Sequence, residues 1–326
     1  MKKTTKILLI IATALAASGM ILFTVVMSFN KWDFRRMSTV KYEEATHEIE
    51  KDITAIDIDI NAGNVEIKKS DDGKIRIFAT QPVLERFEAC VLDDGTLSVT
   101  QRNDRKWYDY IAIGFQGASL TVYLPGEEYG ALKIDASTSD VTVDAGFTFG
   151  AIDISITTGD VACNTKSGGD VNIKTTTGDI ELKDIRANNL TVKATTGGIT
   201  VDTAICDGDV SITVTTGNCD LSGMRCENFY STGGSGDLKM NIVRADKNLE
   251  IKRTTGGVTL EKCDAGEIEI STTTGNVTGS LASEKNFFAQ ATTGKIDVPE
   301  TTIGGTCKIT TTTGDITIKI SPVPTE

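Results

Sequence analysis

The chain is organised by an alternation of apolar and polar residues around a short Thr-Thr-Gly-Asp corner. Apolar residues stand seven and five positions before the corner glycine and two and four positions after it, as around Gly159. The pattern recurs at intervals of 19 or 20 residues. The corner glycines are Gly159, Gly178, Gly197, Gly217, Gly236, Gly256, Gly275, Gly294 and Gly314, and Ser139 holds the equivalent position one interval earlier.

Residues that alternate in polarity with a period of two form β-strands with one buried face. Glycine permits positive φ at a corner, and an Asp or Asn directly after it can bond the local backbone. A repeat this short buries too few side chains to be stable alone, so neighbouring repeats must stack. The sequence therefore predicts an all-β fold, a single-chain β-solenoid of about ten rungs of 19–20 residues, in which a rung is one turn of the coil.

The N-terminus predicts a membrane anchor. Lys2, Lys3 and Lys6 precede 23 uncharged residues that run from Ile7 to Phe29. At 1.5 Å per helical residue this run spans about 35 Å, which is enough to cross a bilayer. The segment 14–16 also resembles the cleavage site of a signal peptide, but the apolar run continues beyond it. We therefore predict one uncleaved transmembrane helix, whose orientation the nearly equal flanking charges leave open.

These signals divide the chain into six parts. They are a basic tail at 1–6, the anchor at 7–29, a juxtamembrane linker at 30–51, an irregular β region or cap at 52–130, the regular solenoid at 131–320 and a tail at 321–326. The irregular region begins with a full copy of the repeat around Gly63, which lies 76 residues, or four intervals of 19, before Ser139. We therefore expect degenerate rungs between them. The tail is the end of the stack in sequence order, and its prolines cannot donate to a strand ladder, so we expect it to discourage edge-to-edge association of solenoids.

The recurring Thr-Thr-Gly-Asp-Ile pattern also points to a family. Together with Tyr123-Leu124-Pro125, the apolar pair at 132 and 134, and the segment 137–141, it resembles the "putative adhesin" β-strand-repeat family, a domain of unknown function in Gram-positive envelope proteins. The resemblance covers roughly residues 50 to 320. It implies a β-solenoid displayed at the cell envelope and supplies no catalytic or ligand residues. Some family members are encoded in envelope-stress operons, which implies a different role for the solenoid, as an accessory or sensor subunit.

One segment of the irregular region concentrates aromatic side chains, in a chain that is only 6% aromatic. The candidate contact residues are Trp107, Tyr108, Tyr110 and Phe115, and Arg102, Arg105 and Lys106 flank them. Aromatic and cationic side chains together suit contact with a protein, a sugar polymer or lipid headgroups. The alternative is a hairpin that caps the first rungs, and we consider it the simpler explanation.

The seven cysteines show no CxxC or Cys-His spacing, so the sequence predicts no zinc site. Cys206 and Cys226 occupy the same phase of adjacent rungs, where a disulfide is within reach. Alanines hold that phase in other rungs, so a plain stack of small residues is the alternative. The corner aspartates lack the paired glycines of calcium-binding rolls. We therefore expect no metal and no cofactor.

Neither catalysis nor nucleic-acid binding is supported. His47 is the single histidine, and no nucleophile elbow, phosphate loop or dinucleotide fingerprint occurs. The chain carries a net charge of −12, and because residues 1–36 contribute +5, the remainder carries −17. Such an acidic surface repels nucleic acid. Rows of paired threonines are similar to ice-binding surfaces, but here they adjoin a corner, where β propensity and turn bonding explain them.

These observations predict a single-pass protein of the cell membrane with an extracellular solenoid. Its function would be that of a non-catalytic binding or structural module at the envelope. The expected partners are the membrane, through the N-terminal helix, and an unidentified protein or envelope polymer. The alternative is an accessory or sensor subunit of an envelope-stress system that contacts another membrane protein.

Overall fold

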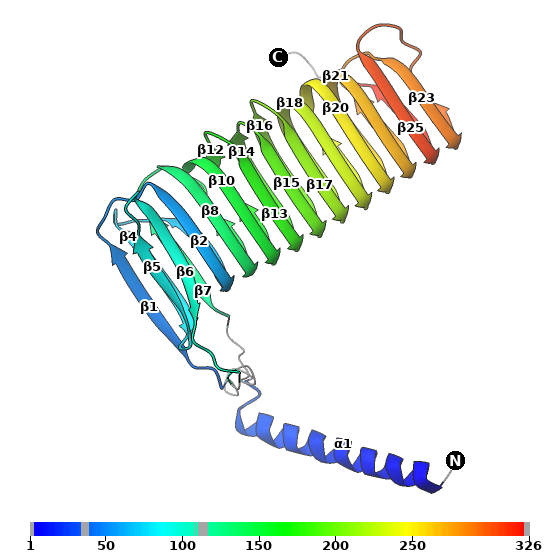
Figure 1. Ribbon diagram of the computed structural model, residues 1–326. Helices are drawn as coiled ribbons and strands as arrows, with labels where there is room; N and C mark the ends of the chain where they lie inside the picture. The colour runs from blue at the N-terminus through cyan, green and yellow to red at the C-terminus, as the bar shows by residue number, and fades with distance from the viewer. Residues whose placement is uncertain (1–2, 34–38, 108, 110–116, 323–326) are drawn as a thin grey trace.

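The structure is a computed structural model that describes residues 3–33, 39–107, 109 and 117–322. It consists of a long β-solenoid, an irregular cap at one end and one helix, α1 (Lys3–Phe29), beyond the cap (Figure 1). The predicted all-β solenoid of about ten rungs with one apolar N-terminal helix is therefore confirmed.

The strands fall into three groups. The cap strands are β1 (Tyr42–Ile49), β4 (Ile75–Pro82), β5 (Glu85–Val91), β6 (Thr96–Asn103) and β7 (Ser119–Leu124). Strands that precede a corner are β2 (Ala55–Ala62), β8 (Glu128–Thr138), β10 (Thr148–Thr158), β13 (Val171–Thr177), β15 (Leu190–Thr196), β17 (Val210–Thr216), β20 (Arg244–Thr255), β23 (Asn286–Thr293) and β25 (Thr306–Thr313). Strands that follow a corner or complete the rung are β3 (Asn64–Lys69), β9 (Val141–Val143), β11 (Val161–Cys163), β12 (Lys166–Ser167), β14 (Ile180–Ala187), β16 (Ile199–Cys206), β18 (Cys219–Ser235), β19 (Leu238–Asn241), β21 (Val258–Thr274), β22 (Val277–Leu281), β24 (Ile296–Asp297) and β26 (Ile316–Ile320).

The core consists of columns of buried side chains that run along the rod. Each column is formed by residues at equivalent positions in successive rungs. Ile154 of β10 lies opposite Ile173 of β13, which lies opposite Val192 of β15, all in parallel register. These side chains are at most 1% exposed. Burial of one aliphatic side chain contributes about 1.5 to 3 kcal/mol, and stacking supplies that burial to every rung.

The contacts at the corners explain why a glycine, and an Asp or Asn directly after it, recur in the repeat. A Cβ on Gly178 would lie 1.9 Å from the carbonyl oxygen of Gly159, and its φ is +140°. Glycine is therefore required by the close approach of rungs as well as by φ. The next residue ties rungs together, because Oδ1 of Asp160 accepts the backbone N–H of Asp179 at 2.7 Å.

The predicted four intervals between Gly63 and Ser139 are wrong. Strand β2 pairs directly with β8, where Ile58 lies opposite Ile134, and the Ser139 hydroxyl donates to the Gly63 carbonyl. The two corners therefore belong to adjacent rungs. The chain leaves the stack after β3 and returns at β8, and the cap strands β4 to β7 fill the interval between them.

The cap covers the first rung with mixed strand directions. Strand β6 runs parallel to β2 and β7 parallel to β3, whereas β5 is antiparallel to β6 and β4 is antiparallel to β7. Strand β1 pairs antiparallel with β4. The predicted linker through residue 51 is therefore wrong in its last part, because Tyr42–Ile49 is a half-buried strand of the sheet.

The rungs at the far end do not stack in sequence order. Strand β25 lies between β21 and β23, so that Ile309 faces Ile270 on one side and Ala289 on the other (Figure 1). Likewise, β26 lies between β22 and β24. The expectation that the chain's last rung ends the stack is therefore wrong, because Ser321 follows the inner strand β26 and β23 with β24 forms the outermost described rung. The effect of the tail prolines on edge-to-edge association stays a prediction.

Candidate contact surface at the N-terminal cap

The predicted aromatic patch falls in the cap, and the structure describes one of its members. Trp107 is 78% exposed. Tyr108, Tyr110 and Phe115 lie outside the described residues. The patch as a four-residue surface therefore stays a prediction, and the surface that can be built from the structure surrounds Trp107.

Strand pairing brings three segments to the end of the cap from which the chain continues to α1. Tyr42 lies opposite Pro82, and Glu85 lies opposite Asn103. The start of β1, the β4–β5 turn and the segment after β6 therefore meet there. Twelve residues separate Phe29 from Tyr42, and an extended chain spans at most about 3.6 Å per residue, so this end lies within about 47 Å of the end of the helix.

A cleft of about 290 Å³ lies between these segments. Its walls combine apolar and charged side chains: Thr39, Val40, Lys41, Pro82, Val83, Leu84, Arg105 and Asp109. Leu84 is 41% exposed at the tip of the β4–β5 turn. The exposed Trp107 lies in sequence between Arg105 and Asp109 of this lining. Exposed apolar side chains that gather at a cleft are a feature of contact surfaces.

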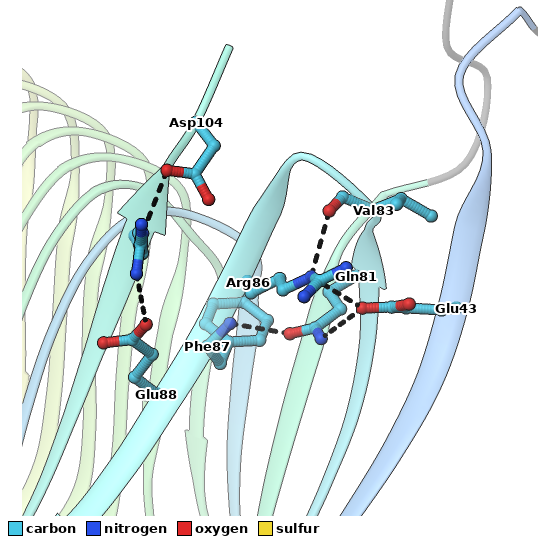
Figure 2. A network of polar contacts seen from close by, with 8 residues as sticks. Glu43, Gln81, Val83, Arg86, Phe87, Glu88 and Asp104 are labelled. Carbon is cyan, nitrogen blue, oxygen red and sulfur yellow. Dashed lines mark hydrogen bonds and ion pairs between the residues drawn. The ribbon is translucent and has the colours of Figure 1, made fainter.

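A polar network holds the β4–β5 turn in place (Figure 2). Gln81 is buried, donates to Oε1 of Glu43 at 3.1 Å, and accepts the backbone N–H of Phe87 at 2.6 Å. Arg86 also reaches Oε1 of Glu43, at 3.2 Å, and donates to the carbonyl of Val83 at 3.1 Å. The network makes Leu84 part of a fixed turn.

Ion pairs continue around the same end. Arg105 contacts Oε1 of Glu85 at 3.1 Å, and this pair is largely shielded from solvent. Arg102 bridges Asp104 at 2.9 Å and Glu88 at 3.5 Å across the β5–β6 hairpin (Figure 2). Partial burial raises the pKa of Tyr42. These groups position the surface and leave no pair arranged as nucleophile and base.

The corner carboxylates have a structural role. Each accepts a backbone N–H of the next rung, as Asp140 does from Asp160 at 3.0 Å and Asp179 from Gly198 at 2.6 Å. A second ladder at the opposite turn joins Asn228 to Asp209 at 2.8 Å. Among the residues that the structure describes, no group of His, Cys, Asp or Glu is arranged to hold a metal ion.

The cysteines are core residues with one exception. All seven are free thiols, and Cys90 alone of the seven is exposed. Burial raises the pKa of Cys163, Cys206, Cys226 and Cys307 to about 12. Cys206 lies opposite Ala187, and Cys226 lies opposite Ala245, in a column of small residues. The column of small residues is thus present, and both of its cysteines are free thiols.

Sequence reasoning missed a buried charge. Arg253 is 4% exposed, donates to Oγ of Ser231 at 3.1 Å, and has Nε and Nη1 without a hydrogen-bond partner. Its guanidinium fills the space above Gly233, where a Cβ would lie 1.8 Å from Nη1. The signal was present in the repeat, because Arg253 and Gly233 occupy the same inward phase of adjacent rungs.

The family is settled by a profile match. The profile of Toastrack DUF4097 matches residues 53–213 and 202–323. The chain belongs to the Toastrack DUF4097 family. The two matches of this Toastrack chain include the cap strands β4 to β7 as well as the regular rungs, whereas β1 lies before the matched residues. None of the curated proteins matches the chain.

Solved structures similar to this Toastrack protein are distant in sequence. A putative lipid binding protein from Parabacteroides distasonis is 16% identical, with a TM-score of 0.47, and the alignment covers 74% of this chain and 95% of that protein. A putative adhesin from Bacteroides fragilis is 14% identical with a TM-score of 0.42, covering 86% and 97%. A putative adhesin from Parabacteroides merdae is 12% identical with a TM-score of 0.47, covering 74% and 97%.

Proposed function

We propose that this Toastrack protein is held in the cell membrane by α1 and displays its solenoid outside the cytoplasm as a non-catalytic binding or structural module of the envelope. The observation that carries the proposal is the contrast between α1 and the rod. Within α1, Met27 is the one buried residue, and the helix is long and apolar enough to cross a membrane. In water each exposed Leu or Ile forgoes about 1.5 to 3 kcal/mol of burial, so a bilayer is the natural environment of this helix.

The rod supports a passive role. Its corner glycines and carboxylates are occupied by contacts between rungs. A depression of about 630 Å³ on its side is lined by residues of both charges, among them Glu127, Lys166, Asp184 and Arg186. Nothing in this lining pairs a nucleophile with a base. Such a rod presents regular rows of side chains and two distinct ends to a partner.

The second candidate is an accessory subunit that contacts a neighbouring membrane protein. It is favoured by the cleft lined by Leu84, Arg105 and Asp109, which lies at the end of the cap from which the chain continues to α1. A membrane-embedded partner would reach this end of the protein first. A photo-crosslinker at Leu84 that captures one membrane protein, while the same group at Thr176 captures none, would favour this candidate over a free-standing binding module.

The experiment that tests the main proposal is thiol labelling on intact cells. The reporter is Thr176→Cys, an exposed position on β13, in a Cys90→Ser background, because the other six thiols are buried. We expect an impermeant maleimide to label the reporter without lysis. Labelling only after lysis would place the solenoid in the cytoplasm and refute display at the envelope.

A further inference from the structure

The two ends of the solenoid are built differently. At the cap end, β2 is covered by β6, and the outermost strands β1 and β5 carry charges at Glu43, Glu44, Glu85 and Arg86. At the far end, β23 pairs with β25, and no other described strand pairs with it. Natural proteins protect sheet edges with charges, prolines or a covering segment, because an open edge is a template for another strand.

Among the described residues, no strand covers the outer edge of β23, and the strand itself lacks the other two protections. Its sequence is Asn-Phe-Phe-Ala-Gln-Ala-Thr-Thr, with no charge and no proline. Phe288 is 57% exposed, and Ile296 in the adjoining β24 is 46% exposed although its phase is buried in inner rungs. The proline-containing tail leaves from an inner rung and therefore does not continue this edge.

The open hydrogen-bonding groups of β23 can be assigned. In a parallel ladder, alternate residues bond to opposite neighbours. The Asn286 N–H bonds to the Gly305 carbonyl on the β25 side. The backbone N–H and C=O groups of Phe287, Ala289 and Ala291 therefore point to the open side.

We infer that this edge pairs with the β23 strand of a second copy, antiparallel and about a two-fold axis through Ala289. In this register all three open residues bond to the partner, since Ala289 faces its equivalent and Phe287 faces Ala291 of the partner. A bulky inward side chain thus meets a small one in both halves of the contact. On the outer face Phe288 lies opposite Gln290 of the partner, and no like charges meet along the strand.

The charge of the tip agrees with a second copy as the occupant. The protein carries −12 overall, yet residues 284–301 contain Lys285 and Lys295 against Glu284, Asp297 and Glu300, which leaves −1. Two acidic rods therefore repel along their sides and meet with least repulsion end to end. The contact is isologous and closed, so it produces a dimer and not a filament.

The direction of the dimer has a consequence for adhesion, and this step alone rests on the proposed function. A two-fold axis across the tip points the two rods in opposite directions, which places the two α1 helices at opposite ends. If the solenoid is displayed outside the cell, the paired copies belong to two facing membranes. The partner of this binding module would then be the same protein on another cell.

Disulfide trapping in the full chain tests the pairing. Directly opposite residues of a non-hydrogen-bonded pair have Cα atoms about 4.5 Å apart, and diagonal ones about 7 to 8 Å. Detergent-solubilised Phe288→Cys protein mixed with Gln290→Cys protein, both with Cys90→Ser, should cross-link under mild oxidation. The matched control, Phe288→Cys mixed with Thr292→Cys, joins diagonal positions and should cross-link at least about tenfold less, since a disulfide needs a shorter span.

Three further variants separate pairing from folding. Ala289→Pro removes an N–H that points to the open side, so the intrachain ladder is retained and cross-linking should be lost. The double variant Phe288→Glu/Gln290→Glu, mixed with Phe288→Lys/Gln290→Lys, should sediment as a dimer, whereas either double variant alone should not. Equal cross-linking of the opposite and diagonal pairs, or none for the opposite pair with circular dichroism unchanged, would overturn the inference.

The membrane step is tested separately. Vesicles that carry the full chain should aggregate, and vesicles that carry the Ala289→Pro variant should not. If trapping succeeds but the Thr176 reporter labels only after lysis, the pairing stands and envelope display falls. If the reporter labels on intact cells and trapping fails, display stands and the self-pairing edge falls.

Discussion

Substitution of a corner glycine tests whether rung contacts dictate the repeat. In Gly178→Ala the new Cβ would lie 1.9 Å from the carbonyl oxygen of Gly159 and 2.5 Å from its carbon. Ordinary contact begins at 3.4 Å, so the rungs must separate locally by about 1.5 Å. The Gly159 N–H bond to Thr177 and the Val161 N–H bond to Asp179, both 2.9 Å, cross this gap.

The expected loss follows from these contacts. Together with the bond from the Asp179 N–H to Asp160 at 2.7 Å, three hydrogen bonds are broken or stretched. At about 1 kcal/mol each they account for about 3 kcal/mol. Holding an alanine at φ +140° adds about 1 to 3 kcal/mol. We therefore expect Gly178→Ala to lower the free energy of unfolding by about 4 to 6 kcal/mol.

The matched control is Gly168→Ala, because a Cβ on Gly168 meets nothing within 4 Å. Urea unfolding of the full chain in detergent, followed by far-ultraviolet circular dichroism, compares the two variants with the parent. A Gly178→Ala protein within about 1 kcal/mol of the Gly168→Ala protein would refute the reasoning, since that is the size of an ordinary substitution.

Three further predictions concern buried groups. Arg253→Met should leave the free energy of unfolding unchanged or raise it, because two nitrogens of this buried guanidinium lack hydrogen-bond partners. Gly233→Ala should destabilise the parent protein but be tolerated in the Arg253→Met variant. A double-mutant cycle measured by urea unfolding would show this coupling. In folded protein at pH 8, a thiol reagent should modify Cys90 and spare the six buried cysteines, as intact-mass measurement would report. The free energy of unfolding should also fall at alkaline pH, because burial raises the pKa of Cys163 from 9.0 to about 12 and the thiol therefore ionises more readily in the unfolded chain. This contribution to stability is complete below pH 9 and is lost as the pH rises to 12. The loss is at most about 1.4 kcal/mol per pH unit for each such thiol. Cys163→Ala should show a shallower decline over that range, and an unchanged slope would contradict the assignment.

The regular part of the fold was predictable because its chemistry repeats. A glycine that admits a neighbouring carbonyl, an acid that accepts the next N–H, and alternating aliphatic residues all recur at one interval. Because the repeats are so similar, their spacing did not show which rungs are direct neighbours. The distance from Gly63 to Ser139 fits four intervals, but β2 and β8 are direct neighbours. Spacing alone does not distinguish stacked rungs from an excursion of the chain.

The cap and the candidate surface were harder to predict for a different reason. The residues of β1 alternate only weakly in polarity, since an outer strand has one half-buried face. The network around Gln81 joins residues 38 positions apart in sequence. It depends on antiparallel strand pairings that the local sequence does not predict. Trp107 was found by composition, whereas Leu84 became notable only once the structure placed the β4–β5 turn beside Arg105 and Asp109.

The order of the last rungs bears on how the chain folds as it is synthesised. Strands β23 and β24 leave the ribosome before β25 and β26, yet in the native stack β25 separates β23 from β21. Until the final residues emerge, β21 offers an edge on which β23 can dock with a similar corner. If β23 docks on β21 first, the two strands have to separate before β25 can enter between them. Completion of the tip therefore requires β25, although β23 precedes it in the chain.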